Sequence, residues 1–297
     1  MEIHANQDLR LGAGSALAAR VRRRIPGPRE RHAPRSGRWT SLALAALGIA
    51  AFVIAWYAAV QWLALPRFKI LPGPGEVFGE WVSRSPAYGV SLFTSSYWAD
   101  IWASVRRVAI AFLAAAATGV PLGLAMGWST RVRQYLFPVL EVIRPIPILA
   151  WVPIAILMFK GSETPVLFLT FLAAFYATTL NTLLGVQSVD RDLIRAARCL
   201  GASQRDVFRD VVVPGALPYI FTGLEIAMGV AWFSLVAGEM IAGRHGLGYL
   251  INSSYTTTRY PTIVIAMITL GIVGFASSAA VRLVGRRLMA YRTVAVR

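Results

Sequence analysis

Long apolar runs alternate with short polar segments along the chain. A helix needs about 20 predominantly apolar residues to cross the hydrocarbon core of a bilayer, and six runs approach or exceed that length. We therefore predict membrane-spanning helices near residues 41–65, 103–128, 136–158, 164–186, 217–241 and 261–284. The pattern predicts an all-α membrane protein.

The third apolar run is the least regular, because charged residues and prolines interrupt it. The stretch EVIRPIPILAWVP contains Glu141 and Arg144 together with Pro145, Pro147 and Pro153. A proline at membrane depth removes a backbone donor and bends a helix, which is tolerated where protein or a water-lined path covers the freed carbonyls. We expect this span to face the interior of the helix bundle.

The second apolar run carries Gly119, Gly123 and Gly127, a repeated small-xxx-small pattern. Such a pattern lets another helix approach closely. Packing within the chain is favoured over a dimer seam by about three to one.

Composition and charge exclude a soluble fold and a nucleic-acid-binding protein. Hydrophobic residues make up 56% of the chain and charged residues 15%, which is more apolar surface than a soluble fold buries. The net charge of +16 comes from basic residues in short segments between apolar runs, not from one basic face. We put nucleic-acid binding below about 5%, because a positive-inside bias explains the same charge.

The arginine distribution predicts the topology and the domain limits. Residues 1–39 hold nine arginines against three acidic residues and predict a disordered basic cytoplasmic tail. Residues 40–288 then form the transmembrane domain, with a cytoplasmic loop at 187–216, and residues 289–297 a cytoplasmic C-terminal tail. We expect a multi-pass protein of the cytoplasmic membrane, in contact with lipid, with both termini inside the cell.

The sequence contains no catalytic or metal-binding constellation. The single Cys199 cannot form an internal disulfide, and the three histidines are too scattered to suggest a metal site. A Walker A loop needs a lysine that follows a glycine, and neither Lys69 nor Lys160 does. We therefore predict a protein that is not an enzyme, with no cofactor and no ATPase site of its own.

The segment RAARCLGASQRDVFRDVVVP, between the fourth and fifth predicted spans, predicts two short helices joined by a tight turn. Asp190 caps a first helix, and Gly201 fits the left-handed position that ends it. Ser203 caps a second helix, with Asp206 completing a short capping box. On that helix Val207, Phe208, Val211 and Val212 form an apolar stripe, and Pro214 is predicted to stop the helix before Pro218 opens the next span.

From composition alone, such an element has about a 40% chance of simply lying on anionic lipid. However, the spacing of RAA, three residues, Gly201, nine residues and VVVP resembles the EAA loop of ABC importer permeases: Glu-Ala-Ala, three residues, Gly, nine residues, Ile-x-Leu-Pro. The resemblance implies that the segment forms coupling helices that dock into a groove on the ATPase subunit. Arg195 stands where a glutamate is usual, which reverses the charge, whereas Ala196, Ala197, Gly201 and Pro214 match.

The likeness covers residues 66–284. LPGPGEVF, SVRRVAIAFLAAAATGVPLGLAMGW, IRPIPILAWVPIAILMFKG and GLEIAMGVAWFSLVAGEMIAGRHGLGYLI resemble successive segments of permeases for nitrate, sulfonate, taurine or bicarbonate. This implies the type I ABC importer permease fold and a pore subunit that moves a small solute, which we expect to be anionic. It also implies two separate ATPase copies, an extracytoplasmic substrate-binding protein and a homodimeric pore. The ATPase-coupling residues implied are Arg195, Ala196, Ala197, Gly201, Ser203, Val207, Phe208, Val211 and Pro214.

Charged residues at membrane depth are candidates for the substrate path. For Glu141 and Arg144 the favoured alternative is an internal i,i+3 ion pair, and for Trp151 and Trp232 it is packing between spans. Arg106 and Arg107, near the outer end of the second span, either snorkel to the interface or line a cavity. The candidate path residues are Glu141, Arg144, Trp151, Glu225, Trp232 and Glu239.

Two other classes of protein stay open. A secondary transporter driven by an ion gradient predicts internal repeats with matching broken helices, and the two halves show no convincing repeat. A membrane anchor without transport activity would not need the glycine-hinged segment between two spans.

Overall fold

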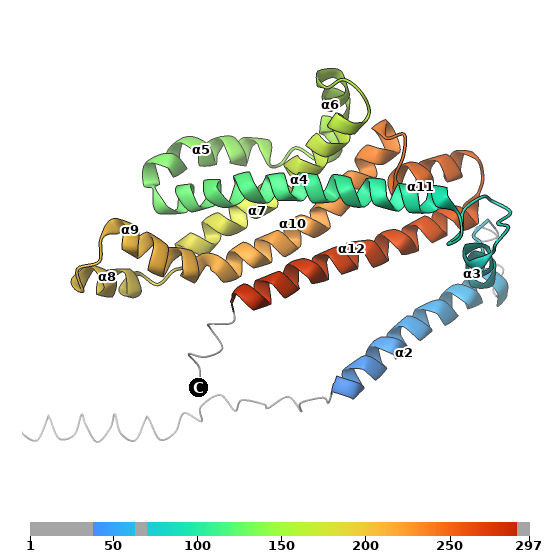
Figure 1. Cartoon of the computed structure of the whole chain (residues 1–297), viewed down its shortest axis with the longest axis horizontal. Helices are drawn as coiled ribbons and strands as arrows, with labels where there is room; N and C mark the ends of the chain where they lie inside the picture. Colours follow the sequence, from blue (N-terminus) through green and yellow to red (C-terminus); the bar gives the residue numbers. More distant parts are fainter. Residues whose placement is uncertain (1–37, 63–69, 290–297) are drawn as a thin grey trace, which may run out of the picture. The chain divides into compact units, whose positions relative to one another are not determined.

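The computed structural model describes residues 38–62 and 70–289, in which every regular element is a helix (Figure 1). The predicted all-α class is confirmed, and the tails predicted at 1–39 and 289–297 lie almost entirely outside the described residues. The α-helices are α2 (Arg38–Tyr57), α3 (Pro74–Val82), α4 (Ser95–Trp128), α5 (Thr130–Ile143), α6 (Val152–Met158), α7 (Glu163–Gln187), α8 (Arg191–Cys199), α9 (Gln204–Asp206), α10 (Val213–Ala242), α11 (Leu247–Thr256) and α12 (Tyr260–Leu288). Shorter π- or 3-10-helical segments lie at Ala58–Trp62, Ile148–Trp151 and Val207–Val212.

The chain divides into two compact units, Met1–Ala55 and Trp56–Arg297. The described part of the first unit is most of α2, a helix with no charged residue after Arg38. The second unit contains all the later helices.

Five helical stretches in the described residues are long and apolar enough to cross a membrane. They confirm the first, second, fourth, fifth and sixth predicted spans, and they lie at Ala43–Gln61, Ser95–Trp128, Glu163–Gln187, Gln204–Ala242 and Tyr260–Leu288.

The third predicted span, near residues 136–158, is formed by two helical stretches with a sharp bend between them. The stretches Thr130–Ile143 and Ile148–Met158 meet at an angle of 88°. The break falls at Arg144–Pro147, where two prolines lack the N–H that a continuous helix needs. This element is a broken span or a re-entrant loop rather than one straight helix.

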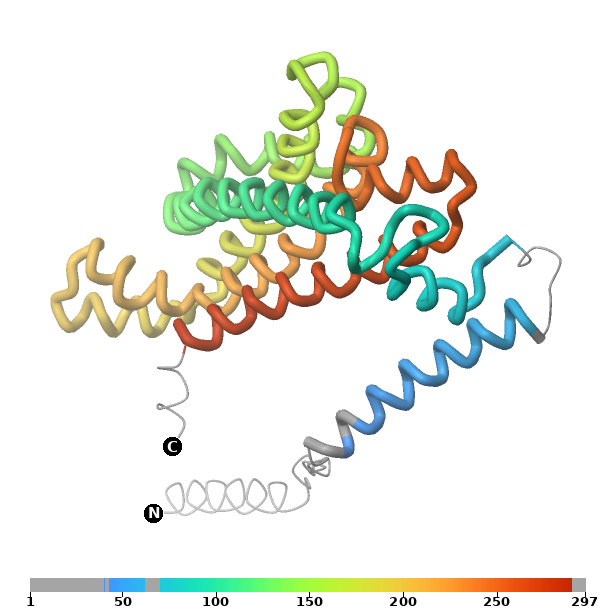
Figure 2. Tube along the Cα trace, turned by 45° about the vertical axis from the view of Figure 1, so that its right-hand side comes forward, coloured from blue at the N-terminus to red at the C-terminus, as the bar shows by residue number. Residues whose placement is uncertain are grey.

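The centre of the second unit is α7, which packs along both α4 and α10 (Figures 1 and 2). Buried residues occur on all sides of α7, as expected for a helix surrounded by other helices. The largest apolar cluster joins residues of α4, α7, α10 and α11, among them Phe112, Ala174 and Trp232.

The glycine series of α4 lies in the contact between α4 and α7. A Cβ atom added at Gly119 would lie 2.8 Å from Thr179 Oγ1, and one at Gly123 would lie 2.6 Å from the Thr179 carbonyl oxygen. A Cβ at Gly127 would collide with the Val186 side chain. The prediction that these glycines serve packing within the chain is therefore confirmed.

The prediction that Pro214 ends a helix before Pro218 starts the next span is wrong. Residues Gln204–Ala242 form one continuous helical stretch, with a π-helical section at Val207–Val212. Pro214 comes directly after the π-helical section and Pro218 lies inside α10, and neither proline ends the helix. The second helix of the loop is thus the start of the fifth span.

Candidate functional site

The loop between α7 and α10 has the predicted helix–turn–helix geometry. The Asp190 side chain accepts a hydrogen bond from the Asp192 backbone N–H at 2.9 Å and caps α8. At the other end of α8, Gly201 has a φ of +85°, in the left-handed region that glycine favours. The Gly201 N–H donates to the Arg198 carbonyl and the Ala202 N–H to the Ala197 carbonyl, the two bonds of a Schellman motif.

The second helix begins with the predicted capping box. The Ser203 N–H donates to Asp206 Oδ2 at 2.9 Å, and the Asp206 N–H donates to Ser203 Oγ at 3.3 Å. The corner between the helices is therefore held by backbone and side-chain bonds within a few residues, and α8 and α9 project beyond the ends of α7 and α10 (Figure 2).

The predicted apolar stripe after Ser203 packs inside the chain. Val207 is fully buried, and half-buried Phe208 lies against Trp128 of α4 with their ring centroids 5.2 Å apart. Val212 is buried in the same cluster, which also includes Val186 of α7. These side chains fix the base of the loop to α4 and α7, so Val207 has no surface left for another protein.

The exposed apolar residues of the loop lie on α8 and at its end. Leu193 is 59% exposed and Leu200 88% exposed. Ala196 is also exposed, and the Arg195 side chain forms an exposed ion pair with Asp192 at 3.0 Å. The outward surface of the loop is therefore apolar at its centre and charged beside it.

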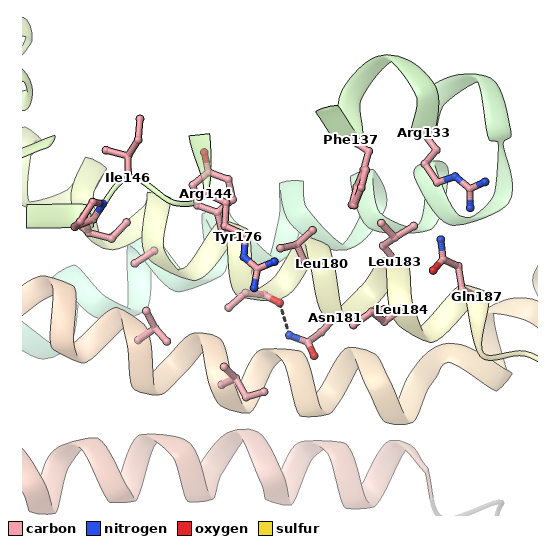
Figure 3. Close-up of a pocket in the computed structure, with 16 residues that line it drawn as sticks. Arg133, Phe137, Arg144, Ile146, Tyr176, Leu180, Asn181, Leu183, Leu184 and Gln187 are labelled. Atoms are coloured by element: carbon pink, nitrogen blue, oxygen red, sulfur yellow. Dashed lines mark hydrogen bonds between the residues drawn. The ribbon is translucent and has the colours of Figure 1, made fainter. Parts of the chain in front are cut away.

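A cavity of about 780 Å³ opens between the α5 end, the bend after it, α7 and α10 (Figure 3). Arg133 and Arg144 reach it from the α5 side, and Tyr176, Asn181 and Gln187 reach it from α7. None of the residues that line it is acidic. Only Arg144 among these five residues was predicted from the sequence, since the direction in which a polar side chain of a helix points depends on the packing of the helices.

The other predicted path residues lie outside this cavity. Glu141 is exposed, and within the described residues it forms no ion pair with Arg144. Glu225 forms an ion pair with Arg282 at 3.6 Å, and the Trp232 indole N–H donates to Ser277 Oγ at 2.8 Å. Trp151 is half-buried in a small apolar cluster with Val152 and Leu169. The structure brings one of the six residues, Arg144, to the cavity.

The sixth of these residues, Glu239, is completely buried in an ion-pair network at the end of α10. Arg107 Nη1 donates to Glu239 Oε1 at 2.6 Å, and the Ser104 hydroxyl donates to the same carboxylate at 2.9 Å. Arg107 also pairs with Glu163 at the start of α7. Glu239 is thus a structural group rather than a pore-lining one, and Arg107 neither snorkels nor lines an open cavity.

This network also caps α11. The Gly248 N–H donates to Glu239 Oε2 at 2.9 Å, and the Leu247 N–H donates to Ser104 Oγ at 2.8 Å. The first N–H groups of a helix need such partners. In the part of the chain that the structure describes, no group of three or more His, Cys, Asp or Glu side chains is placed to hold a metal ion.

The fold is that of the membrane subunits of ABC importers. A chain of the MetNI methionine ABC transporter in an inward-facing conformation superposes with a TM-score of 0.53, covering 65% of this chain and 94% of that one at 16% identity. A chain of an amino acid ABC transporter gives a TM-score of 0.54 at 19% identity, covering 64% of this chain and 92% of that one.

The family follows from sequence comparison. Residues 119–290 match the family described as the binding-protein-dependent transport system inner membrane component, and the chain belongs to this family. The taurine transport system permease protein TauC of Escherichia coli is 37% identical over 233 residues, which cover 78% of this chain and 83% of that protein. The nitrate import permease protein NrtB of Leptolyngbya laminosa is 38% identical over 193 residues, 65% of this chain and 69% of that protein. A probable ABC transporter permease protein of Brucella melitensis is 36% identical over 253 residues, 85% of this chain and 98% of that protein.

The chain is therefore the multi-pass permease subunit of an ABC importer. It is a transport component and not an enzyme, and it works with a separate ATPase subunit and a substrate-binding protein.

Proposed function

We propose that this permease passes a small solute that carries an oxyanion group, such as nitrate, a sulfonate, taurine or bicarbonate, through the cavity lined by Arg133 and Arg144. The carrying observation is the charge of that cavity: two guanidinium groups line it and no carboxylate does. A guanidinium stays protonated at any physiological pH and presents a fork of donors that matches an oxyanion. The named relatives agree with this chemistry, because nitrate and the sulfonate group of taurine are both oxyanions.

The size of the cavity favours transit over tight binding. The cavity has a volume of about 780 Å³. A single water molecule occupies about 30 Å³ in the liquid, so the cavity has room for one such anion together with many water molecules. A partly hydrated anion held by one arginine at a time can leave again, as conduction requires. The binding protein then determines which solute is transported, and the pore selects for a negatively charged group.

The exposed face of the α8 corner is the proposed contact with the ATPase subunit. Leu193 and Leu200 are apolar side chains that water surrounds in the isolated chain, and a groove on a partner would bury them. Ala196 and Ser203 border this face, Arg195 is exposed on another side of α8, and Gly201 sets the angle of the corner. Val207 and Phe208 support this face indirectly, by fixing the loop to the spans.

The assembly proposed here contains two copies of this chain and two ATPase subunits, because one chain supplies one such loop. Both termini lie in the cytoplasm, on the side of the loop, as the arginine distribution predicts. ATP is bound by the ATPase subunits, so the permease itself carries no cofactor.

Uptake by the complete complex tests the substrate class. The complex with its ATPase and binding protein is reconstituted in proteoliposomes, and ATP-dependent uptake of nitrate, taurine and bicarbonate is measured one by one. Arg144→Gln is expected to lower the maximal uptake of the transported solute about tenfold, the loss of one charge-assisted contact, while Arg144→Lys retains most of it. Arg131→Gln, an equal change of charge outside the cavity, is the matched control. Equal uptake by Arg144→Gln and Arg131→Gln would show that Arg144 is not part of the substrate path.

A further inference from the structure

A second cavity, of about 480 Å³, lies between the α4–α5 turn, the end of α7 and α8. Three arginines line it: Arg133 from α5, and Arg191 and Arg198 from the two ends of α8. No acidic residue lines it, and within the described residues none of the three arginines lies within ion-pair distance of a carboxylate.

The spacing along α8 explains why these arginines face the spans. Positions 191, 194 and 198 lie within about 60° of one another around a helix of 3.6 residues per turn. The residue between the two arginines, Ile194, is half-buried in the apolar cluster that contains Val186 and Val212. The arginines therefore flank an anchoring contact, whereas Leu193 and Leu200 lie on the opposite, outward face of the loop. An ATPase docked on the face that contains Leu193 and Leu200 would not cover Arg191 and Arg198, which face the spans.

The two cavities are neighbours that share lining residues. Arg133 and Gln187 line both of them, so the guanidinium of Arg133 stands between the cavity that holds Arg144 and the cavity that holds Arg191 and Arg198. Three guanidinium groups without a counter-charge, gathered around one cavity, concentrate anions even though Arg191 and Arg198 are exposed to solvent. The arrangement is a series of arginines that leads from the spans to the loop.

From this juxtaposition we infer that the second cavity is an anion-binding site, held by Arg133, Arg191 and Arg198, that takes a free small oxyanion at the loop end of the path. The inference rests on the proposed function for the identity of the natural anion, but not for the existence of the site. An anion bound there contacts α5 and α8 together, so its presence ties the loop to the spans. The position of the loop then depends on whether an anion is still bound at this end of the path.

Iodide quenching of tryptophan fluorescence provides a probe of this site, because Trp128 also lines the cavity. Iodide is a small anion that quenches on contact, and acrylamide is a neutral quencher that reports accessibility without charge. The contribution of Trp128 is the difference between the complete permease–ATPase complex and the same complex with Trp128→Phe, both in phosphatidylcholine nanodiscs. Nitrate, taurine and inorganic phosphate are then added as competitors at constant ionic strength.

We expect iodide to quench the fluorescence of Trp128, and we expect at least one of the three competitors to displace the iodide. Arg191→Gln combined with Arg198→Gln should weaken the binding of iodide about tenfold or more. Acrylamide quenching of the double variant stays unchanged, which shows that the pocket is still folded. Arg131→Gln, outside the lining of the cavity, retains iodide binding and shows the effect of removing one positive charge elsewhere.

Equal iodide quenching in the double variant and in Arg131→Gln would overturn the inference. So would a site that phosphatidylglycerol in the nanodisc blocks and that none of the free oxyanions enters, because the arginines then hold a lipid headgroup. The proposed function fails separately, by an absence of ATP-dependent anion uptake, and that failure leaves the quenching result intact.

Discussion

Substitution of Gly201 tests the loop corner most directly. Its φ of +85° is unfavourable for any residue with a Cβ, while a Cβ built there meets nothing within 4 Å. The effect is therefore one of backbone conformation alone: about 1 kcal/mol for alanine, and more for the β-branched valine. A change of 1–2 kcal/mol shifts a two-state equilibrium by roughly 5- to 30-fold.

That shift acts on the Schellman bonds that fix the direction in which α8 leaves the corner. Gly201→Val is expected to move Leu200 and Leu193 out of register with the ATPase, while buried Val207 and Phe208 hold the base of the loop in place. The variant should insert in the membrane at normal levels and retain several-fold less ATPase on co-purification. Gly201→Ala should show a smaller loss in the same direction.

The chain contains a matched control for this experiment. Gly161, between α6 and α7, also has a φ of +85° and also has nothing within 4 Å of a built Cβ. Gly161→Val therefore carries the same backbone penalty at a site away from the loop. Equal ATPase retention by the two valine variants, at matched membrane levels, would refute the assignment of this corner to ATPase docking.

Three further outcomes follow from the described contacts. Glu239→Ala should destabilise the complex by about 3–5 kcal/mol, seen as a lower thermal midpoint, because Arg107 loses a buried partner; a shift no larger than that of Glu225→Ala, at a half-exposed pair, would contradict this. Gly123→Leu should prevent close packing of α4 on Thr182 of α7 and lower the folded yield, whereas Gly271→Leu, with open space at its Cβ, should be tolerated; equal yields would argue against the seam. Reporter fusions after residues 255 and 297 should report outside and inside respectively, and two fusions on the same side would disprove the topology.

Local chemistry made most of the loop predictable. The Asp190 cap, the left-handed Gly201 and the Ser203–Asp206 box each depend on residues at most three positions apart, and all three are present in the structure. The direction in which the apolar stripe faces was not predictable in the same way. Val207 packs against residues of the α4 and α7 ends, which are far from it in the sequence.

The prolines of the third and fifth spans have opposite effects, and only the bend in the third span was predicted. A proline in the sequence signals a missing donor, but its effect depends on whether that donor was needed. Pro214 comes directly after a π-helical section, and the helix continues through it. Pro145 and Pro147 lie two residues apart beside Arg144, and there the chain turns by 88°. The same bend carries Arg144 to the cavity.

The buried network around Glu239 was hidden for a different reason. Arg107 and Glu239 are 132 positions apart, and nothing in either local sequence indicates that they meet. Arginine at membrane depth signals an unknown partner, and only the packing of α4 against α10 identifies it.

The continuity of the fifth span connects the loop corner to this network. Residues Gln204–Ala242 form one helical stretch, about 58 Å long at 1.5 Å per residue, with the capping box at one end and Glu239 near the other. Between them the helix packs along α7 through close contacts such as Gly223 on Asn181 and Gly185 on Tyr219, which resist sliding. We therefore expect a push on the corner to tilt this stretch rather than to bend it, except at the π-helical section Val207–Val212 and at Pro218, where the hydrogen-bonding pattern departs from that of an α-helix. Because the Glu239 network holds α4, α7 and α11 to the far end, the stretch can tilt only with those helices, and this makes the bundle respond to the loop as a unit.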